Sequence, residues 1–282
     1  MDILQNNAVL WMFLAALVGL QIGSFLNVVV WRLPVMMQRD WDAEVAHATG
    51  QAHQPTVFNL AKPGSHCTNC KTPLRARELV PVWSYFWLKG RCGHCGVPVS
   101  MRYPLVELAV AALWAFCAGH WGVTVSALAW ACFATMLLAL ALIDLDTMLL
   151  PDALTQPLLW LGLICAAVGL TKVGLQESLW GAVAGYGFLW AVQALFGLVT
   201  GKQGMGAGDF KLLAALGAWL GWLALPGIVL LSSLLAVLVA LVMRLRGQLV
   251  SGQPLPFGPY LALAGMLTAA FDPMAVFTQP LL

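Results

Sequence analysis

Charged residues are scarce in this sequence of 282 residues, which holds 14 Lys+Arg and 12 Asp+Glu, only 9% of the chain. Soluble domains carry about 25% charged residues, so an ordinary hydrated surface is excluded. Hydrophobic residues reach 61%, and their runs, roughly 18–22 residues long, can cross a hydrocarbon core about 30 Å thick. The composition predicts an integral membrane protein. We expect the lipid bilayer to be a partner and nucleic acid not to be one.

The first apolar run, residues 8–30, also lacks the marks of a secretory signal peptide. No basic residue precedes it, and it ends at Trp31-Arg32 without a small-residue cleavage site. A signal peptide has a basic start, a shorter apolar region and such a site. We therefore interpret residues 8–30 as a retained membrane span.

The remaining apolar runs predict an all-α polytopic membrane protein with about eight transmembrane helices. A polar, cysteine-bearing segment interrupts them at residues 31–103. The predicted organisation is a first helix within 1–30, a loop domain over 31–103 and a seven-helix membrane domain over 104–282. The eight predicted spans are 8–30, 104–120, 123–143, 154–171, 178–199, 209–225, 226–243 and 257–276.

The distribution of basic residues predicts the orientation in the membrane. Nine of the 14 Lys+Arg lie in residues 31–103, and basic loops stay in the cytoplasm. With this loop inside and the N-terminus outside, counting spans leaves only Lys172 on the outer side. The span count and the charge bias agree.

Two acids stand out because each lies at the cytoplasmic end of a predicted span. Asp144 ends the run in "ALALIDLDTMLLPDALT", and Asp209 opens the run after "GMGAG". A charge at mid-bilayer costs about 2.5–3.5 kcal/mol, so such acids usually face a cavity or a partner. Two adjacent carboxylates share one proton, which allows one to activate water while the other polarises a carbonyl. Gly204, Gly206 and Gly208 would supply positive φ angles and room for a substrate.

Structural interpretations of these acids stay open. Asp209 and Asp152 can serve as helix-terminal acids that complement the helix dipole, and Asp152 is a plausible cap. Asp146 fits a structural role better than a chemical one. Glu107, near the start of the second span, suits a buried salt bridge as well as chemistry. A phosphate-binding role for the Gly-rich stretch is weaker, because no Lys-Ser/Thr pair closes it.

Four cysteines form two CxxC pairs in the polar loop. "CTNC" and "CGHC" are separated by 21 residues, a pattern typical of a tetrahedral zinc site of the ribbon type. Disulfides are disfavoured in the cytoplasm, and redox or iron chemistry are minor alternatives. Because four thiolates leave no open coordination position, the predicted zinc is structural. The predicted ligands are Cys67, Cys70, Cys92 and Cys95.

The order of these motifs resembles that of the type IV prepilin peptidases, intramembrane aspartyl proteases of the GxGD class, over nearly the whole chain. The matching stretches are "GSFLNVVVWRLP" at 23–34, the two CxxC pairs, "SMRYPLVE" at 100–107, "IDLDTMLLPD", "GMGAGD" and "PFGPYLALAG" at 256–265. The resemblance implies that Asp144 and Asp209 are the catalytic aspartates and that the four cysteines bind zinc.

The resemblance also implies the reaction and its location. Members cleave the leader peptides of prepilins and pseudopilins, for type IV pili and type II secretion, in the bacterial inner membrane. They then methylate the new N-terminal residue from S-adenosylmethionine. The resemblance implies that the loop over 31–103 helps to bind the methyl donor, but no dinucleotide-type Gly motif appears there, so the donor-binding residues are not assigned from the sequence.

Two other classes of function compete with this interpretation. An ion- or proton-coupled transporter would use the same acids as carriers and the Gly/Pro-containing helices as gates. It would leave the four-cysteine loop unexplained, and no internal repeat is evident. A non-catalytic assembly scaffold would need neither acid.

Overall fold

The computed structural model describes residues 7–50, 57–201, 204–248 and 255–271. Within these ranges the chain is helical, and β structure is limited to two isolated bridges, His66–Pro73 and Arg91–Pro98. The predicted all-α membrane class is confirmed. The chain divides into two compact units, 1–131 and 132–282. The boundaries predicted at 30/31 and 103/104 remain a prediction.

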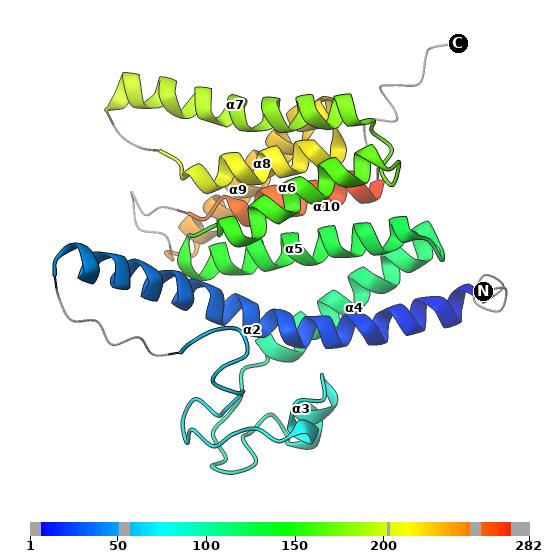
Figure 1. Cartoon of the computed structure of the whole chain (residues 1–282), viewed down its shortest axis with the longest axis vertical. Helices are drawn as coiled ribbons and strands as arrows, with labels where there is room; N and C mark the ends of the chain where they lie inside the picture. The colour runs from blue at the N-terminus through cyan, green and yellow to red at the C-terminus, as the bar shows by residue number, and fades with distance from the viewer. Residues whose placement is uncertain (1–6, 51–56, 202–203, 249–254, 272–282) are drawn as a thin grey trace. The chain divides into compact units, whose positions relative to one another are not determined.

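The first unit is built on two long helices that pack closely, α2 (Ala8–Ala48) and α4 (Arg102–Trp121) (Figure 1). Glycines on α2 allow this approach. A Cβ at Gly19 would lie 2.8 Å from the Cα of Ala111, and one at Gly23 would lie 2.7 Å from the Cα of Glu107. Between these helices in sequence lie two short helices, η1 (Ala76–Glu78) and α3 (Trp83–Trp87).

Helix α2 continues well past Val30, where the first predicted span ends. The side chain of Arg32 is buried and donates hydrogen bonds from Nη1 to the carbonyl oxygens of Asn59 (2.9 Å) and Leu60 (3.3 Å). Arg39 places its guanidinium 4.1 Å from the ring centre of Phe58. The helix therefore does not end where the residues change from apolar to polar. Beyond this point its basic side chains bind residues 58–60 of the loop that follows.

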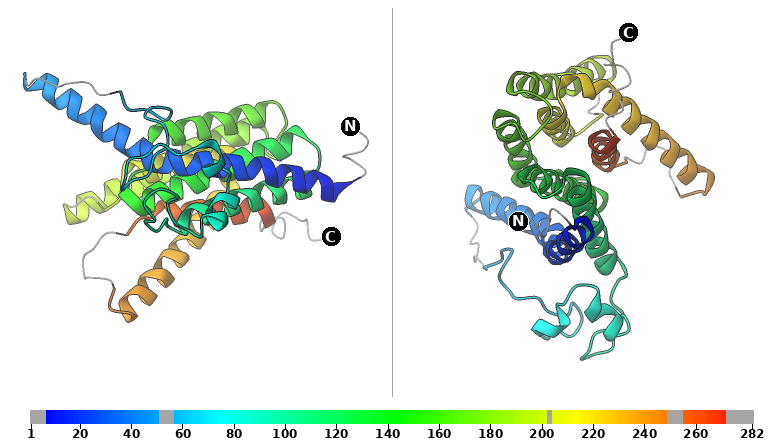
Figure 2. Two further views of the ribbon diagram at one scale, coloured as in Figure 1. Left: turned by 90° about the horizontal axis from the view of Figure 1, so that it is seen from below. Right: turned by 90° about the vertical axis from the view of Figure 1, so that its right-hand side faces the viewer.

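The second unit holds the C-terminal part of α5 (Val125–Thr147) and the helices that follow. Helix α8 is its centre: ten of its 14 residues are buried, and it packs against α6, α7 and α10. Figures 1 and 2 show α7 and α8 side by side. The following helices are α6 (Asp152–Ala167), α7 (Leu175–Thr200), α8 (Ala207–Leu220), η2 (Trp222–Ala224), α9 (Leu225–Leu245) and α10 (Gly258–Phe271).

Each of the eight predicted spans coincides with a helix, but the helices differ in length. Within the described residues, five segments are long and apolar enough to cross a membrane: α2, α4, α5, α7 and Trp222–Leu245. The other three, α6, α8 and α10, have 16, 14 and 14 residues. At 1.5 Å per residue a 14-residue helix is about 21 Å long, shorter than the ~30 Å core. The predicted tail of the last span, 272–276, lies outside the described residues.

Candidate functional site: a cysteine cluster and a carboxylate pair

The four predicted zinc ligands lie together. The Sγ atoms of Cys67, Cys70, Cys92 and Cys95 all lie within 4.8 Å of one another, and those of Cys67 and Cys95 are 3.8 Å apart. With Zn–S bonds of about 2.3 Å, the edge of a sulfur tetrahedron measures about 3.8 Å. All four thiols are free. The donor set and its spacing fit zinc.

The two CxxC turns have the same backbone structure. In the first, the Cys67 N–H donates to the Thr72 carbonyl oxygen (3.0 Å) and the Lys71 N–H to the Cys67 carbonyl oxygen (3.0 Å). In the second, Cys92 and Gly96 take the same positions, at 2.8 and 2.9 Å. The residue after each pair has a positive φ, 58° at Lys71 and 71° at Gly96. Each turn therefore presents two thiols to one point.

Hydrogen bonds favour the thiolate form that zinc needs. Thr72, whose Oγ1 lies 3.3 Å from the Cys70 Sγ, lowers the pKa of Cys70 to about 6. The backbone N–H of Cys95, followed by that of His94, lowers the pKa of Cys92. Because the thiolate and not the thiol is the metal ligand, these hydrogen bonds prepare one cysteine of each turn for a cation.

Asp144 is buried near the end of α5, where a backbone donor orients it. Its side chain is 4% exposed, and its Oδ2 accepts a hydrogen bond from the Gly258 N–H at the start of α10 (2.9 Å). A Cβ on Gly258 would lie 2.8 Å from that oxygen. Oδ2 is thus held in place.

Asp209 lies in the first turn of α8, close enough to Asp144 for a direct electrostatic interaction. It is 8% exposed. Complementing the helix dipole contributes about 0.3–1 kcal/mol, whereas the effective cost of burying a charged group is several kcal/mol. A role as a helix-terminal acid therefore does not account for its burial. The structure brings the two predicted aspartates together, while Asp146 is exposed.

Two expectations about the neighbouring residues are wrong. Asp152 does not cap α6: Pro151 is the N-cap residue, and Asp152 instead pairs with Lys211, whose Nζ lies 2.6 Å from its Oδ1. The Gly-rich stretch supplies no positive φ at Gly206, where φ is −79°, or at Gly208, which is helical. At Gly208 the reason for glycine is close packing, because a Cβ would lie 2.7 Å from the Cβ of Leu150.

Glu107 makes a specific contact within the first unit. It is 8% exposed, and its Oε2 accepts a hydrogen bond from the Val82 N–H (2.7 Å). Val82 is the N-cap residue of α3 and has a φ of 60°, which is a strained value for a β-branched residue. Glu107 on α4 thereby fixes the start of α3. The sequence left its role open between a salt bridge and chemistry.

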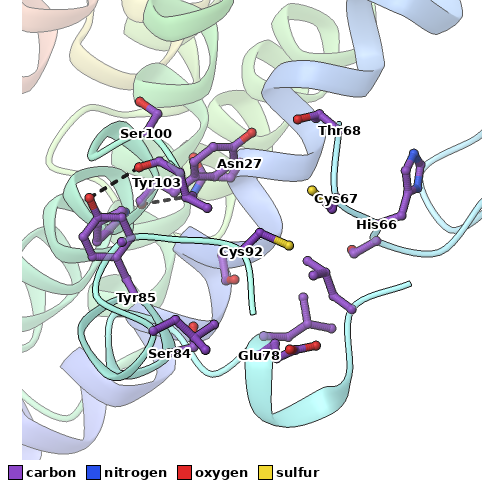
Figure 3. A pocket seen from close by; sticks show the side chains of 18 of the residues that line it. Asn27, His66, Cys67, Thr68, Glu78, Ser84, Tyr85, Cys92, Ser100 and Tyr103 are labelled. Carbon is purple, nitrogen blue, oxygen red and sulfur yellow. Dashed lines mark hydrogen bonds between the residues drawn. The ribbon is translucent and has the colours of Figure 1, made fainter. Parts of the chain in front are cut away.

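A cavity of about 500 Å³ lies beside the cysteine cluster and is lined by residues of α2, α3, α4 and the loop (Figure 3). Cys67 and Cys92 form one side of it, and Glu107 belongs to its wall. No pattern in the sequence indicated this cavity or the Gly258 donor. Neither the PFG stretch nor the loop residues form a chemical motif that could have indicated them.

Comparison with known proteins covers both units. The Bacterial Peptidase A24 N-terminal domain matches residues 17–121, and the Type IV leader peptidase family matches residues 131–241. No solved structure matches the chain.

Three relatives carry the name prepilin leader peptidase/N-methyltransferase. The one from Stutzerimonas stutzeri is 48% identical over 266 residues, 94% of this chain and 92% of the relative. The one from Pseudomonas aeruginosa is 50% identical over 270 residues, which are 95% of this chain and 92% of the relative. The one from Aeromonas hydrophila is 47% identical over 266 residues, 91% and 90%. At this identity and coverage, the chain belongs to the type IV leader peptidase family.

Proposed function

We propose that this protein cleaves the leader peptides of type IV prepilins and pseudopilins with Asp144 and Asp209, and methylates the new N-terminal amine. The observation that carries the peptidase proposal is the burial of two electrostatically interacting carboxylates, one from α5 and one from α8. It is supported by relatives that are named for both activities.

The pair performs cleavage by acid–base chemistry on one shared proton. The ionised aspartate removes a proton from a water molecule, whose oxygen attacks the scissile carbonyl carbon. The protonated aspartate donates to the carbonyl oxygen, which gives a tetrahedral gem-diol. When the C–N bond breaks, the leaving nitrogen takes a proton from the pair. The Gly258 N–H keeps Asp144 oriented throughout.

The cysteine cluster and the methyl donor belong to the first unit in this proposal. Cys67, Cys70, Cys92 and Cys95 would hold a structural zinc ion, since four thiolates complete its coordination. S-adenosylmethionine would supply an electrophilic methyl group for transfer to the amine.

We further propose a bacterial inner-membrane location, with the N-terminus periplasmic and the cysteine-bearing loop cytoplasmic. The support is the concentration of nine of the 14 Lys+Arg in residues 31–103. The basic leader of a prepilin stays in the cytoplasm, which agrees with aspartates at the cytoplasmic ends of their helices.

The test is cleavage of a purified prepilin by the full chain in detergent micelles. Asp144→Asn and Asp209→Asn remove the acid–base pair, and each is expected to lower the cleavage rate by about 10²–10⁴-fold or more. The matched control is Asp146→Asn, on the same helix as Asp144 but exposed, which should retain substantial cleavage. Full activity in either pair variant, or abolition in the control alone, would refute the assignment.

A further inference from the structure

The cavity beside the cysteine cluster has the size of a small-molecule site. Its volume of about 500 Å³ falls in the range of roughly 300–1,000 Å³ that such sites occupy. Every residue that lines it lies between Ser24 and Glu107, inside the first unit. It is therefore separate in sequence from the aspartate pair of the second unit.

Neutral polar groups gather on one side of this cavity (Figure 3). Asn27 on α2 donates from Nδ2 to the carbonyl oxygen of Tyr103 (3.1 Å), an arrangement that leaves the Asn27 Oδ1 as a further acceptor. The Tyr85 hydroxyl lies 3.4 Å from the carbonyl oxygen of Val99. Ser84 also belongs to the lining. Amides and hydroxyls of this kind recognise the edge of a heteroaromatic base and the hydroxyls of a sugar.

Two carboxylates, Glu78 and Glu107, belong to the wall together with the guanidinium groups of Arg32 and Arg91. Glu78 accepts a hydrogen bond from the Arg75 N–H at Oε2 (2.7 Å), and its Oε1 lies 3.7 Å from the His94 Nε2. Glu107 accepts one from the Val82 N–H. A carboxylate offers about four lone-pair sites, so both retain capacity for a ligand. The aromatic rings of the lining add faces that attract a cation.

We propose that this cavity binds S-adenosylmethionine, with Asn27 and Ser84 among the residues that contact it. The inference rests on the proposed function, which requires a methyl donor. The donor carries an adenine, a ribose diol, an ammonium and a sulfonium, and the cavity offers amide, hydroxyl, carboxylate and aromatic partners to these groups. The zinc cluster then has a second consequence, since Cys67 and Cys92 shape the wall of the donor site.

The transfer itself needs no oxidant or second co-reactant. The neutral amine of the processed pilin attacks the methyl carbon, a new N–C bond forms, and the C–S bond breaks. Its electron pair returns to sulfur, which becomes a neutral thioether, and the product is a secondary ammonium. Because an α-amino group has a pKa of about 7.7–8.0, part of the amine is in the reactive neutral form near pH 7.

Binding can be measured without turnover. S-adenosylhomocysteine is titrated calorimetrically into the zinc-loaded full chain in detergent micelles. Asn27→Leu and Ser84→Leu each remove a polar partner and add bulk to the cavity, so the dissociation constant is expected to rise about tenfold or more. Gln21→Leu is the matched control, because Gln21 lies on α2, is exposed and does not line the cavity.

The outcomes separate this inference from the function on which it rests. Unchanged affinity in both variants, with zinc content intact, would overturn the cavity as donor site while cleavage by the wild type stands. If a variant loses its zinc, the wild type is instead labelled with a photoreactive adenosine analogue, and the labelled peptides are identified. Labelled peptides from residues 24–107 support the inference, and labelling elsewhere overturns it. A wild type that neither cleaves nor methylates prepilin would remove both proposals.

Discussion

The cysteine-bearing loop and the helices of the second unit hold their structures by different means. Between residues 57 and 101 only Cys67, Pro81 and Cys92 are buried, and two of these three are predicted metal ligands. In α8, by contrast, ten of 14 residues are buried among other helices. A segment with so little buried apolar surface cannot offset its conformational entropy by packing. The loop therefore depends on a few strong bonds, and the helices depend on many weak contacts.

The largest effect is expected from removal of the metal, which should unfold the loop and leave the helices of the second unit folded. Structural zinc supplies on the order of 10–16 kcal/mol, so Cys92→Ser should abolish zinc binding and unfold residues 57–101. The helices of the second unit should persist. Limited proteolysis read by mass spectrometry, with metal analysis of the same sample, would show cuts confined to the loop. Cys132→Ser, at an exposed cysteine of α5, is the control and should keep about one zinc per chain.

A substitution that pushes α7 away from α8 should lower the stability of the second unit and leave the metal content of the loop unchanged. A Cβ on Gly217 would collide with the backbone carbonyl of Gly181, and overpacking costs about 1–3 kcal/mol or more. Gly217→Leu should lower the thermal unfolding temperature in micelles while zinc content stays unchanged. Gly187→Leu, on α7 with nothing within 4 Å of its Cβ, should change neither. A Gly217 variant as stable as the wild type would contradict the proposed packing.

A smaller change should affect the carboxylate pair without affecting the fold. Gly258→Ala places a methyl group 2.8 Å from the Asp144 Oδ2 and so displaces the carboxylate from its backbone donor. We expect the prepilin turnover number to fall about tenfold, because small misplacements of reacting groups are costly, with little loss of stability. Kinetics and thermal unfolding of one preparation test this. Gly227→Ala, at an open position, should have wild-type turnover.

The smallest effect is expected on the rate of zinc loss, from substitutions at the positive-φ residue of each CxxC turn. Lys71 adopts a φ of 58° and Gly96 one of 71°, a region that glycine occupies without a steric penalty. Lys71→Gly should slow the loss of zinc to a chelator by about twofold to threefold, equivalent to a few tenths of a kcal/mol. Gly96→Ala should accelerate it. Equal rates in both variants would show that the turns do not limit metal retention.

Several features could be predicted from the sequence because their causes are local. Scarce charge and long apolar runs indicated a helical membrane protein, and the spacing of "CTNC" and "CGHC" indicated a metal site. Each CxxC turn is closed by hydrogen bonds between neighbours such as Cys67 and Thr72. Each pair of thiols is thus positioned by contacts within its own turn.

Hydropathy could not distinguish a helix that faces lipid from one that is buried in protein, because both are apolar. The predicted span 209–225 proved to overlap α8, a short helix surrounded by other helices. Hydropathy also ended the first predicted span at Val30, because the residues that follow are polar. Helix α2 continues past this point, and the buried Arg32 is paired with carbonyl groups of the loop.

The sequence by itself thus determined the class of protein, the four cysteines as a candidate metal site and the two acids at the ends of apolar runs. Only the tertiary structure decided that Asp144 and Asp209 interact electrostatically, that Gly258 orients Asp144 and that a cavity lies beside the cysteines. The physical reason is that helix formation follows the residues within a few turns. Which helix faces meet depends on close contacts, such as that of Gly181 with Gly217, between residues far apart in the chain.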